Sequence, residues 1–472
     1  MTSSAKPTGQ TQLTAELVRF CHGITYDMVP AEVVERTKDL FVDWLAVTLR
    51  GTTVPSSTTM AEFAGAFAHP GPSTVLATGE RLDAQYAALA NGTAAHAIEL
   101  DDVTNESSTH PGIVMFPTAL AAAEALHSDP RDVIAAVVAG YEVMMRLGEA
   151  SFNPNGNYDL FHTTGTLGVF GAAMTAGKLL DLTEQQLLMA LGIAGSMASG
   201  SMEYLTNGAW TKRMHPGWAA HNGWIAANLA KNDYRGPETI IEGPFGFLKV
   251  YTRHSQPERI LREIGTPFKV METSIKINAC CRYNHAAIDA AMLLCSEHGV
   301  NPEQVERLRV NVVQGGWTVV AHPIEEKRHP KNVVQAQFST PFGVAVGLVR
   351  GRAGHNEYVQ ANVDDPEIQA IAAKVDLYVS DELDATYPHE WQARLEATLT
   401  DGREITVHVR HPRGGWPGVE LSREEILDKA HELADPVVGP DALTAATNLI
   451  FDLEKLDDLA RIGEALNADS QQ

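Results

Sequence analysis

Cysteines and long apolar stretches are scarce in this chain. Its 472 residues include 4 cysteines, and no run of about 18 apolar residues occurs. Two of the cysteines, Cys280 and Cys281, are adjacent, which suits reduced thiols better than a disulfide framework. The polar segment from Met1 to Gln12 lacks the apolar core of a signal peptide. We therefore expect a cytoplasmic protein that does not span a membrane.

Cofactor-binding motifs are missing as well. The sequence contains no GxGxxG followed by an acidic residue, no Walker loop, no HExxH and no GxSxG. The adjacent cysteines do not match the ligand spacing of a zinc site. We therefore predict chemistry without a cofactor and without a bound metal.

Positive charge is limited. The chain has 36 Lys and Arg residues against 59 Asp and Glu residues, a formal net charge of -23. Such a field argues against nucleic acid as a partner. An anionic small molecule would have to be attracted by local clusters of cations. The length favours two or three domains over a single core.

Helical periodicity dominates from Leu13 to about Ile264. Several of these segments are rich in Ala, Gly and Met and lack a polar face, which indicates helices buried on most sides. Predicted helices run from Pro30 to Gly51, from Asp83 through Ala97, and over Leu187–Ala198 behind a capping box of Thr183 and Gln186.

Near Pro267 the pattern changes to mixed helix and strand. Strands are predicted at Phe268–Ile277 and Val305–Gln314, and as a hairpin of Gln392–Leu399 and Glu404–Val409 around Asp401-Gly402. Helices are predicted over Asn284–His298, Val334–Arg350 and Asp365–Val375, and again after Gly414 behind a capping box of Ser422 and Glu425.

These patterns predict a mainly α protein. The C-terminal helices are too short to bury a core alone, so they should rejoin the first helices. We predict one large all-helical domain from residues 1–266 and 412–472, with a smaller α+β lid domain inserted over residues 267–411.

Acidic residues gather after a histidine in the segment His96-Ala-Ile-Glu99-Leu-Asp101-Asp102. The segment is predicted to end a helix, with Glu99 on the same face as His96. Three acids at a helix C-terminus oppose the macrodipole, so a role in orienting a histidine or binding a substrate hydroxyl is expected. His110 follows in a loop.

Two further segments combine histidine with sites for an anion. His162-Thr-Thr-Gly165 precedes a Gly- and Ala-rich helix, whose first amides favour an anion. Lys212, Arg213 and His215 are predicted to lie just before another helix start. This is the strongest anion-binding element in the sequence.

The last cluster is Lys276-Ile-Asn-Ala-Cys280-Cys281-Arg282-Tyr-Asn-His285. A cysteine nucleophile paired with His285 is conceivable, although small buried thiols are commoner. Lys276 and Arg282 are better candidates as carboxylate ligands. Neutral imidazoles beside fixed cations are suited to moving a proton next to a carboxylate.

In their order along the chain, these motifs resemble the MmgE/PrpD family, which includes 2-methylcitrate dehydratase, cis-aconitate decarboxylase and iminodisuccinate epimerase. The resemblance implies a homodimer whose active site lies between a helical domain and an α+β lid and needs no cofactor. Carried over by motif, the catalytic positions are Glu99, His110, His162, Lys212 and Lys276. The remaining candidates, expected to bind substrate, are Asp102, Arg213, His215, Arg282 and Cys281.

Three positions depart from the family pattern. Glu99 stands where Asp is usual, Val103 where a polar residue commonly follows Asp-Asp, and Cys281 where the decarboxylase branch has a histidine. We therefore interpret the chain first as a carbon-oxygen lyase that dehydrates a small hydroxy di- or tricarboxylate, as 2-methylcitrate dehydratase does. The alternatives are an epimerase or isomerase of a dicarboxylate, a cis-aconitate-type decarboxylase and a non-enzymatic anion-binding protein.

Overall fold

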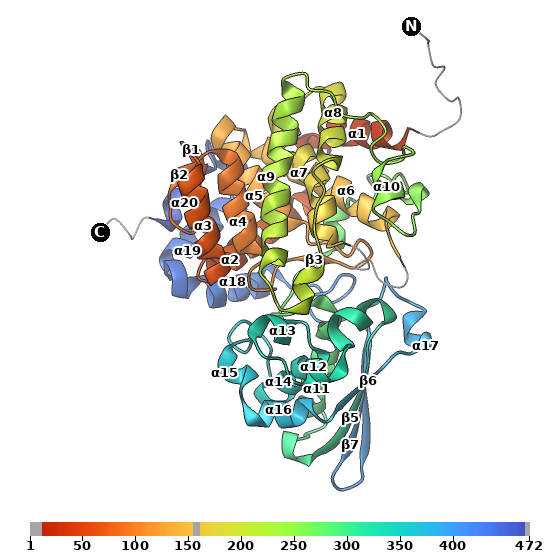
Figure 1. The fold of residues 1–472 in the computed structure, drawn as a ribbon. Coiled ribbons are helices and arrows are strands. Elements are labelled where there is room, and N and C mark those ends of the chain that lie inside the picture. The colour runs from red at the N-terminus through yellow and green to blue at the C-terminus, as the bar shows by residue number, and fades with distance from the viewer. Residues whose placement is uncertain (1–11, 154–160, 468–472) are drawn as a thin grey trace.

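The computed structural model describes residues 12–153 and 161–467. Helices dominate and the strands are short, which confirms the prediction of a mainly α protein. Figure 1 shows a body of long helices above a smaller part in which helices flank a sheet. No helix in the described ranges is long and apolar enough to cross a membrane.

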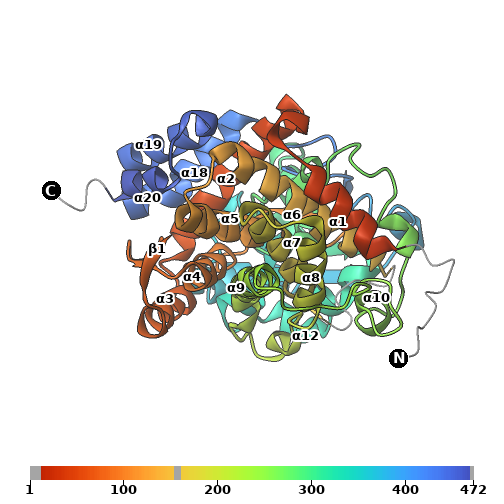
Figure 2. The same cartoon turned by 90° about the horizontal axis from the view of Figure 1, so that it is seen from above.

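The body contains helices from both ends of the chain (Figures 1 and 2). Helix α18 (Arg423–Val438) packs against α2 (Ala31–Gly51), and one buried apolar cluster includes residues from Leu13 to Ile275 and from Leu421 to Leu466. Its helices are α1 Leu13–Gly23, α2 Ala31–Gly51, α3 Pro55–Phe67, α4 Ala84–Ala95, α5 Gly112–Leu126, α6 Pro130–Ala150, α7 Thr163–Leu179, α8 Glu184–Gly195, α9 Thr211–Lys231, α10 Phe247–Val250, α18 Arg423–Val438, α19 Pro440–Phe451 and α20 Ala460–Leu466.

Small residues let the central helices approach closely. A Cβ atom at Gly217 in α9 would clash with the carbonyl oxygen of Leu89 in α4. Gly223, further along α9, packs in the same way against Ala172 of α7. The Gly- and Ala-rich composition therefore fixes α9 between α4 and α7, and so fixes the position of its first turn.

A second apolar cluster lies in the smaller part and consists largely of residues between Ala279 and Val409. Its sheet has the order β6-β5-β7-β8, with β5 parallel to β6 and antiparallel to β7. The strands are β5 Val305–Asn311, β6 Val375–Tyr378, β7 Ala393–Leu399 and β8 Glu404–Val409, and the helices are α11 His285–Ser296, α12 Ile324–Arg328, α13 Val333–Gln337, α14 Thr340–Arg350, α15 Gln360–Val363, α16 Pro366–Ala372 and α17 Asp381–Asp384.

Two small sheets complete the structure. In the body, β1 (Pro70–Thr74) pairs with β2 (Arg81–Leu82). At the junction, β3 (Val103–Thr104) pairs with β4 (Thr273–Ser274), so the loop after α4 is joined to the segment that enters the smaller part. The predicted domain bounds and the homodimer stay predictions.

Several predicted elements match and others do not. The β7–β8 hairpin is confirmed, with Gly402 at a φ of 84° in its turn. The capping boxes at Thr183 and Ser422 are confirmed as well. Asp83 is the residue before α4, but its side chain makes no capping bond and instead accepts a hydrogen bond from the His69 N–H.

The predicted strand over Phe268–Ile277 is wrong for most of its length. Residues Lys269–Glu272 form a 3₁₀ helix, and only Thr273–Ser274 is a strand. The backbone N–H of Lys269 donates to Glu142 of α6 at 2.6 Å. The apolar alternation therefore reflects a tight turn packed against the body.

Two predicted helices also differ. The one expected over Val334–Arg350 is split into α13 and α14, because the Ser339 hydroxyl accepts a hydrogen bond from the Phe342 N–H and starts a new helix with Pro341 in its first turn. The one expected over Asp365–Val375 ends at Ala372, and Val375 begins β6.

Candidate active site

A small cavity lies where the body meets the smaller part, and both contribute to its wall. Five of the sequence-predicted residues line it, namely Glu99, His110, Lys212, Cys281 and Arg282. The remaining lining residues are Val103, Tyr204, Tyr283, Val319, Phe338 and Trp391. Segments more than 180 residues apart in sequence, such as those of Glu99 and Arg282, therefore meet at one place.

The acidic segment reaches this cavity because the chain leaves α4 before it. Helix α4 ends at Ala95, and Glu99 has a φ of 58°, in the left-handed region. The prediction that Glu99 and His96 share a helix face is therefore wrong. The left-handed turn instead places Glu99 in the cavity wall.

Helix α9 begins at Thr211, earlier than predicted. Lys212, Arg213 and His215 consequently lie in the first turns of the helix and not before it. Since residues of one helix turn project in different directions, these three side chains reach different surroundings. Only Lys212 lines the cavity.

Two lysines enclose Glu99. The Lys212 ammonium donates to its Oε1 atom, and Lys276 Nζ lies 3.5 Å from Oε2 and 3.8 Å from Asp101 Oδ1. Burial opposes ionisation of Glu99, but the charges of Lys212 and Lys276 outweigh it and lower the pKa of Glu99 to about 2. Burial likewise opposes the charge on Lys276, yet Asp101 and Glu99 raise its pKa. Glu99 and Lys276 are thus held in their charged forms within a buried cluster.

His110 lines the same cavity and is held by an acid. Its Nδ1 atom lies 2.7 Å from Asp101 Oδ2 and 2.7 Å from the Asp102 carbonyl oxygen. The same carboxylate oxygen lies 3.1 Å from His96 Nδ1. Burial lowers the pKa of His110, against the opposing effect of the Asp101 charge. The free site therefore holds this imidazole neutral at neutral pH.

His162 and His215 form a second layer behind the wall. Their Nδ1 atoms lie 3.0 Å apart, and both rings lie edge-on to the ring of Tyr204, which does line the cavity. The ring of His162 also stacks on His96 at a centroid distance of 5.5 Å. The chain thus brings His162 and His215 together, but not onto the cavity wall.

Two other predicted residues make structural contacts. Asp102 accepts hydrogen bonds from the Gly112 N–H at the start of α5 and from the Tyr141 hydroxyl at 2.8 Å. Burial raises the pKa of Asp102 to about 7. The Arg213 guanidinium donates to the Ser56 hydroxyl at 3.1 Å. Neither side chain is part of the cavity wall.

Most residues of the apolar wall carry no signal in the sequence. Tyr204, Phe338 and Trp391 lie outside the histidine motifs and share no spacing with them. Phe338 faces Lys212, whose Nζ atom lies 4.9 Å from the ring centre. Asp101 was visible as one of three clustered acids, but its sequence neighbours Glu99 and Asp102 looked equally suitable as site residues.

The donor atoms of His96, Asp101 and His110 lie within 4.8 Å of one another. That closeness alone would suit a metal ion. Here, however, both imidazole Nδ1 atoms bond directly to the Asp101 carboxylate, and Lys276 already supplies a positive charge beside it. We therefore interpret the cluster as a hydrogen-bonded one.

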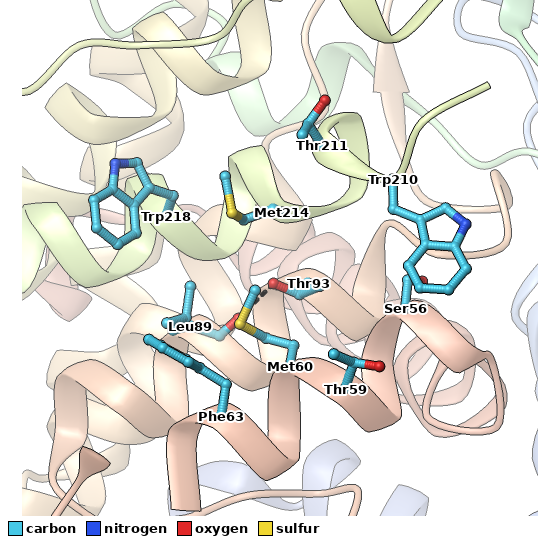
Figure 3. A pocket seen from close by; sticks show the side chains of 10 residues that line it. All are labelled: Ser56, Thr59, Met60, Phe63, Leu89, Thr93, Trp210, Thr211, Met214 and Trp218. Carbon is cyan, nitrogen blue, oxygen red and sulfur yellow. Dashed lines mark hydrogen bonds between the residues drawn. The ribbon is translucent and has the colours of Figure 1, made fainter. Parts of the chain in front are cut away.

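A larger pocket opens elsewhere on the body, between α3 and the first turns of α9 (Figure 3). No ionisable side chain is among its lining residues, which are Ser56, Thr59, Met60, Phe63, Leu89, Thr93, Trp210, Thr211, Met214 and Trp218. It therefore lacks the groups needed to bind a carboxylate or to transfer a proton.

Comparison with known proteins assigns the chain to a family. The model of the MmgE/PrpD N-terminal domain matches residues 15–260, and that of the MmgE/PrpD C-terminal domain matches residues 279–453. The chain belongs to the MmgE/PrpD family. This confirms the resemblance that the histidine and lysine motifs indicate.

Curated relatives of this MmgE/PrpD chain match it over almost its full length. It is 28% identical to a cis-aconitate decarboxylase of Aspergillus terreus, over 98% of each chain. It is 27% identical to the cis-aconitate decarboxylase-like protein oryM of Aspergillus oryzae, over 96% of this chain and 97% of that protein. It is 26% identical to human cis-aconitate decarboxylase, over 97% of this chain and 95% of that protein.

Proposed function

We propose that this MmgE/PrpD chain is a lyase that removes carbon dioxide from a small unsaturated polycarboxylate of the cis-aconitate class. The observation that carries the proposal is the cavity in which Lys212, Arg282 and His110 share one wall, with Lys276 directly behind Glu99. The activity of the curated relatives supports decarboxylation over the dehydration that the sequence first favoured. Dehydration stays the second candidate.

The cations suit the charge that such a reaction develops. When the bond between carbon and a carboxylate breaks, its electron pair stays on carbon and spreads through the double bond toward another carboxylate. Lys212 and Lys276 are fixed near the cavity before substrate arrives, so they stabilise that charge without reorganisation. A proton must then reach the carbon at the far end of the shifted double bond.

His110 is the group of the wall that suits this proton transfer. Its pKa is lowered by burial when the site is empty, and a bound polycarboxylate would favour its protonated form. The imidazole would then give its proton to carbon. His162 and His215 support the same wall from behind through their contacts with Tyr204.

Arg282 suits a substrate carboxylate. Its side chain is buried, its Nε and Nη1 atoms have no hydrogen-bond partner among the described residues, and burial lowers its pKa to about 10. A carboxylate would supply the missing acceptors and the compensating charge. Cys281 lies beside it, but burial raises the pKa of the thiol, so a thiolate nucleophile is not part of the proposal.

The test is a proton-NMR screen in deuterium oxide with cis-aconitate, citrate and 2-methylcitrate. We expect cis-aconitate to be converted into a five-carbon unsaturated dicarboxylate. Dehydration of a hydroxy acid without loss of carbon dioxide would favour the dehydratase instead. Exchange of a carbon-bound proton without a new product would favour an epimerase or isomerase.

A further inference from the structure

We propose that Asp101 is a positioning residue that fixes the tautomer of His110 and leaves Nε2 as the atom that exchanges a proton with substrate. The inference deepens the proposed function, because it specifies how the histidine on the cavity wall acts. It decides a point that the motifs leave open, namely which histidine and which ring nitrogen transfer the proton.

The position of the proton on His110 follows from its two neighbours. Both Asp101 Oδ2 and the Asp102 carbonyl oxygen lie 2.7 Å from Nδ1. A carbonyl oxygen can only accept, and an ionised carboxylate can only accept. Nδ1 must therefore carry the hydrogen, and in the neutral imidazole Nε2 holds the lone pair.

Asp101 is ionised for reasons visible in its surroundings. Burial opposes the charge, but Lys276, His96 and His110 outweigh it and hold the pKa of Asp101 well below its usual range. Its side chain is fully buried, so water does not compete for the carboxylate. His96 donates from its own Nδ1 to the same oxygen at 3.1 Å and so fixes the carboxylate from the other side.

The arrangement has a chemical consequence. Because Nδ1–H is already bonded twice, any proton that His110 gains enters at Nε2, and the positive charge that forms faces the Asp101 carboxylate. The same carboxylate therefore both orients the ring and makes it easier to protonate. In the neighbouring pair, by contrast, the Nδ1 atom of His162 faces the Nδ1 atom of His215 at 3.0 Å.

The titration of His110 depends on every charged or titratable group around it. Asp101 raises the pKa of His110, whereas burial, Lys276 and Lys212 lower it. The groups that face His110 are Asp101, Glu99, Lys212, Lys276, His96 and His162. Asp101 is the largest cause that raises this pKa, so the loss of its charge should move the pKa downward.

The test uses Asp101→Asn in the full-length enzyme acting on cis-aconitate. We expect kcat to fall by at least about 100-fold with a smaller change in KM, and the His110-dependent limb of the pH profile to move to lower pH. Glu124→Gln is the matched control, because Glu124 is a buried carboxylate bonded to Thr74 and does not line the cavity. It should leave both kcat and the profile unchanged.

A second measurement does not need turnover. In wild-type protein with ¹⁵N-labelled histidine, NMR should show His110 protonated at Nδ1, with the signal assigned by its absence in His110→Gln. An Nε2–H tautomer in the wild type, or an unmoved pH profile in Asp101→Asn, would overturn the proposal. Failure of every tested acid to react would reject the proposed function alone, since the tautomer is still measured.

Discussion

The Nδ1 atoms of His162 and His215 lie 3.0 Å apart, so one imidazole donates a hydrogen bond to the other. Burial is the main cause that lowers the pKa of His215 to about 4, and the charge of Lys212 contributes to it. Burial also lowers the pKa of His162 well below its usual range, with a smaller contribution from His215. The two rings form one neutral unit behind Tyr204.

This pairing predicts non-additive kinetics. His162→Gln and His215→Gln should each lower kcat by about 10-fold, and the double variant should be no slower than the worse single one, because either change breaks the same unit. Steady-state kinetics of the four proteins forms the test, with the exposed His298→Gln as control. Multiplied effects in the double variant would show that the two rings act separately.

Lys276 is paired with Glu99 and Asp101, so removal of its positive charge should lower the stability of the fold strongly. Lys276 is fully buried, and Lys276→Met leaves Asp101 without its ammonium. The free energy of unfolding should fall by about 3–5 kcal/mol. Adding Asp101→Asn should restore part of it, because the uncompensated charge disappears. Urea denaturation measures the free energy of unfolding of both variants, with Lys455→Met at an exposed position as the control. A double variant that is less stable than Lys276→Met would contradict this prediction.

The raised pKa of Asp102 predicts that the stability of the fold depends on pH. Burial raises the pKa of its carboxyl to about 7 in the folded protein, from an ordinary 3.8. The folded state thus binds this proton more tightly, and the resulting stabilisation is complete below about pH 4 and is lost as the pH rises through 7. Asp102→Asn should therefore cost more stability at pH 5 than at pH 8. Thermal denaturation at both pH values tests this, and an equal loss of stability at pH 5 and pH 8 would contradict it.

The buried guanidinium of Arg282 is expected to bind a substrate carboxylate, so its removal should weaken substrate binding. Arg282→Met should raise KM for cis-aconitate by more than about 10-fold with a small change in kcat, because the lost interaction is with a carboxylate already present in the ground state. Arg282→Lys should recover part of the affinity. Initial-rate kinetics decides the point, with the exposed Arg307→Met as control. A loss confined to kcat would place Arg282 in the chemical step instead.

Local signals in the sequence predicted local structure well. The capping boxes at Thr183 and Ser422 and the hairpin at Asp401-Gly402 depend on residues a few positions apart, and all three form. The end of α4 and the break before α14 depend on single positions that helical periodicity does not register, such as the Ser339 cap of α14. A prediction from hydrophobic periodicity therefore extends the α4 helix beyond Ala95 and treats α13 and α14 as one helix.

The site was predictable as a set of motifs but not as a geometry. Glu99, His110 and Lys212 belong to motifs that carry charge and imidazole, and they do line one cavity, while their roles in the site stay predictions. The sequence could not tell that Asp101 turns toward the histidines while Asp102 turns toward α5 and Tyr141. Adjacent side chains in an irregular turn have no fixed periodicity, so only the folded backbone decides their directions.

The most direct test of the central claim is the release of labelled carbon dioxide from cis-aconitate carrying ¹³C in its carboxylates. We expect one carbon dioxide for each five-carbon alkene formed by the wild-type enzyme, and about 100-fold less carbon dioxide from His110→Gln. No release by the folded wild-type protein, or equal release by His110→Gln, would contradict it.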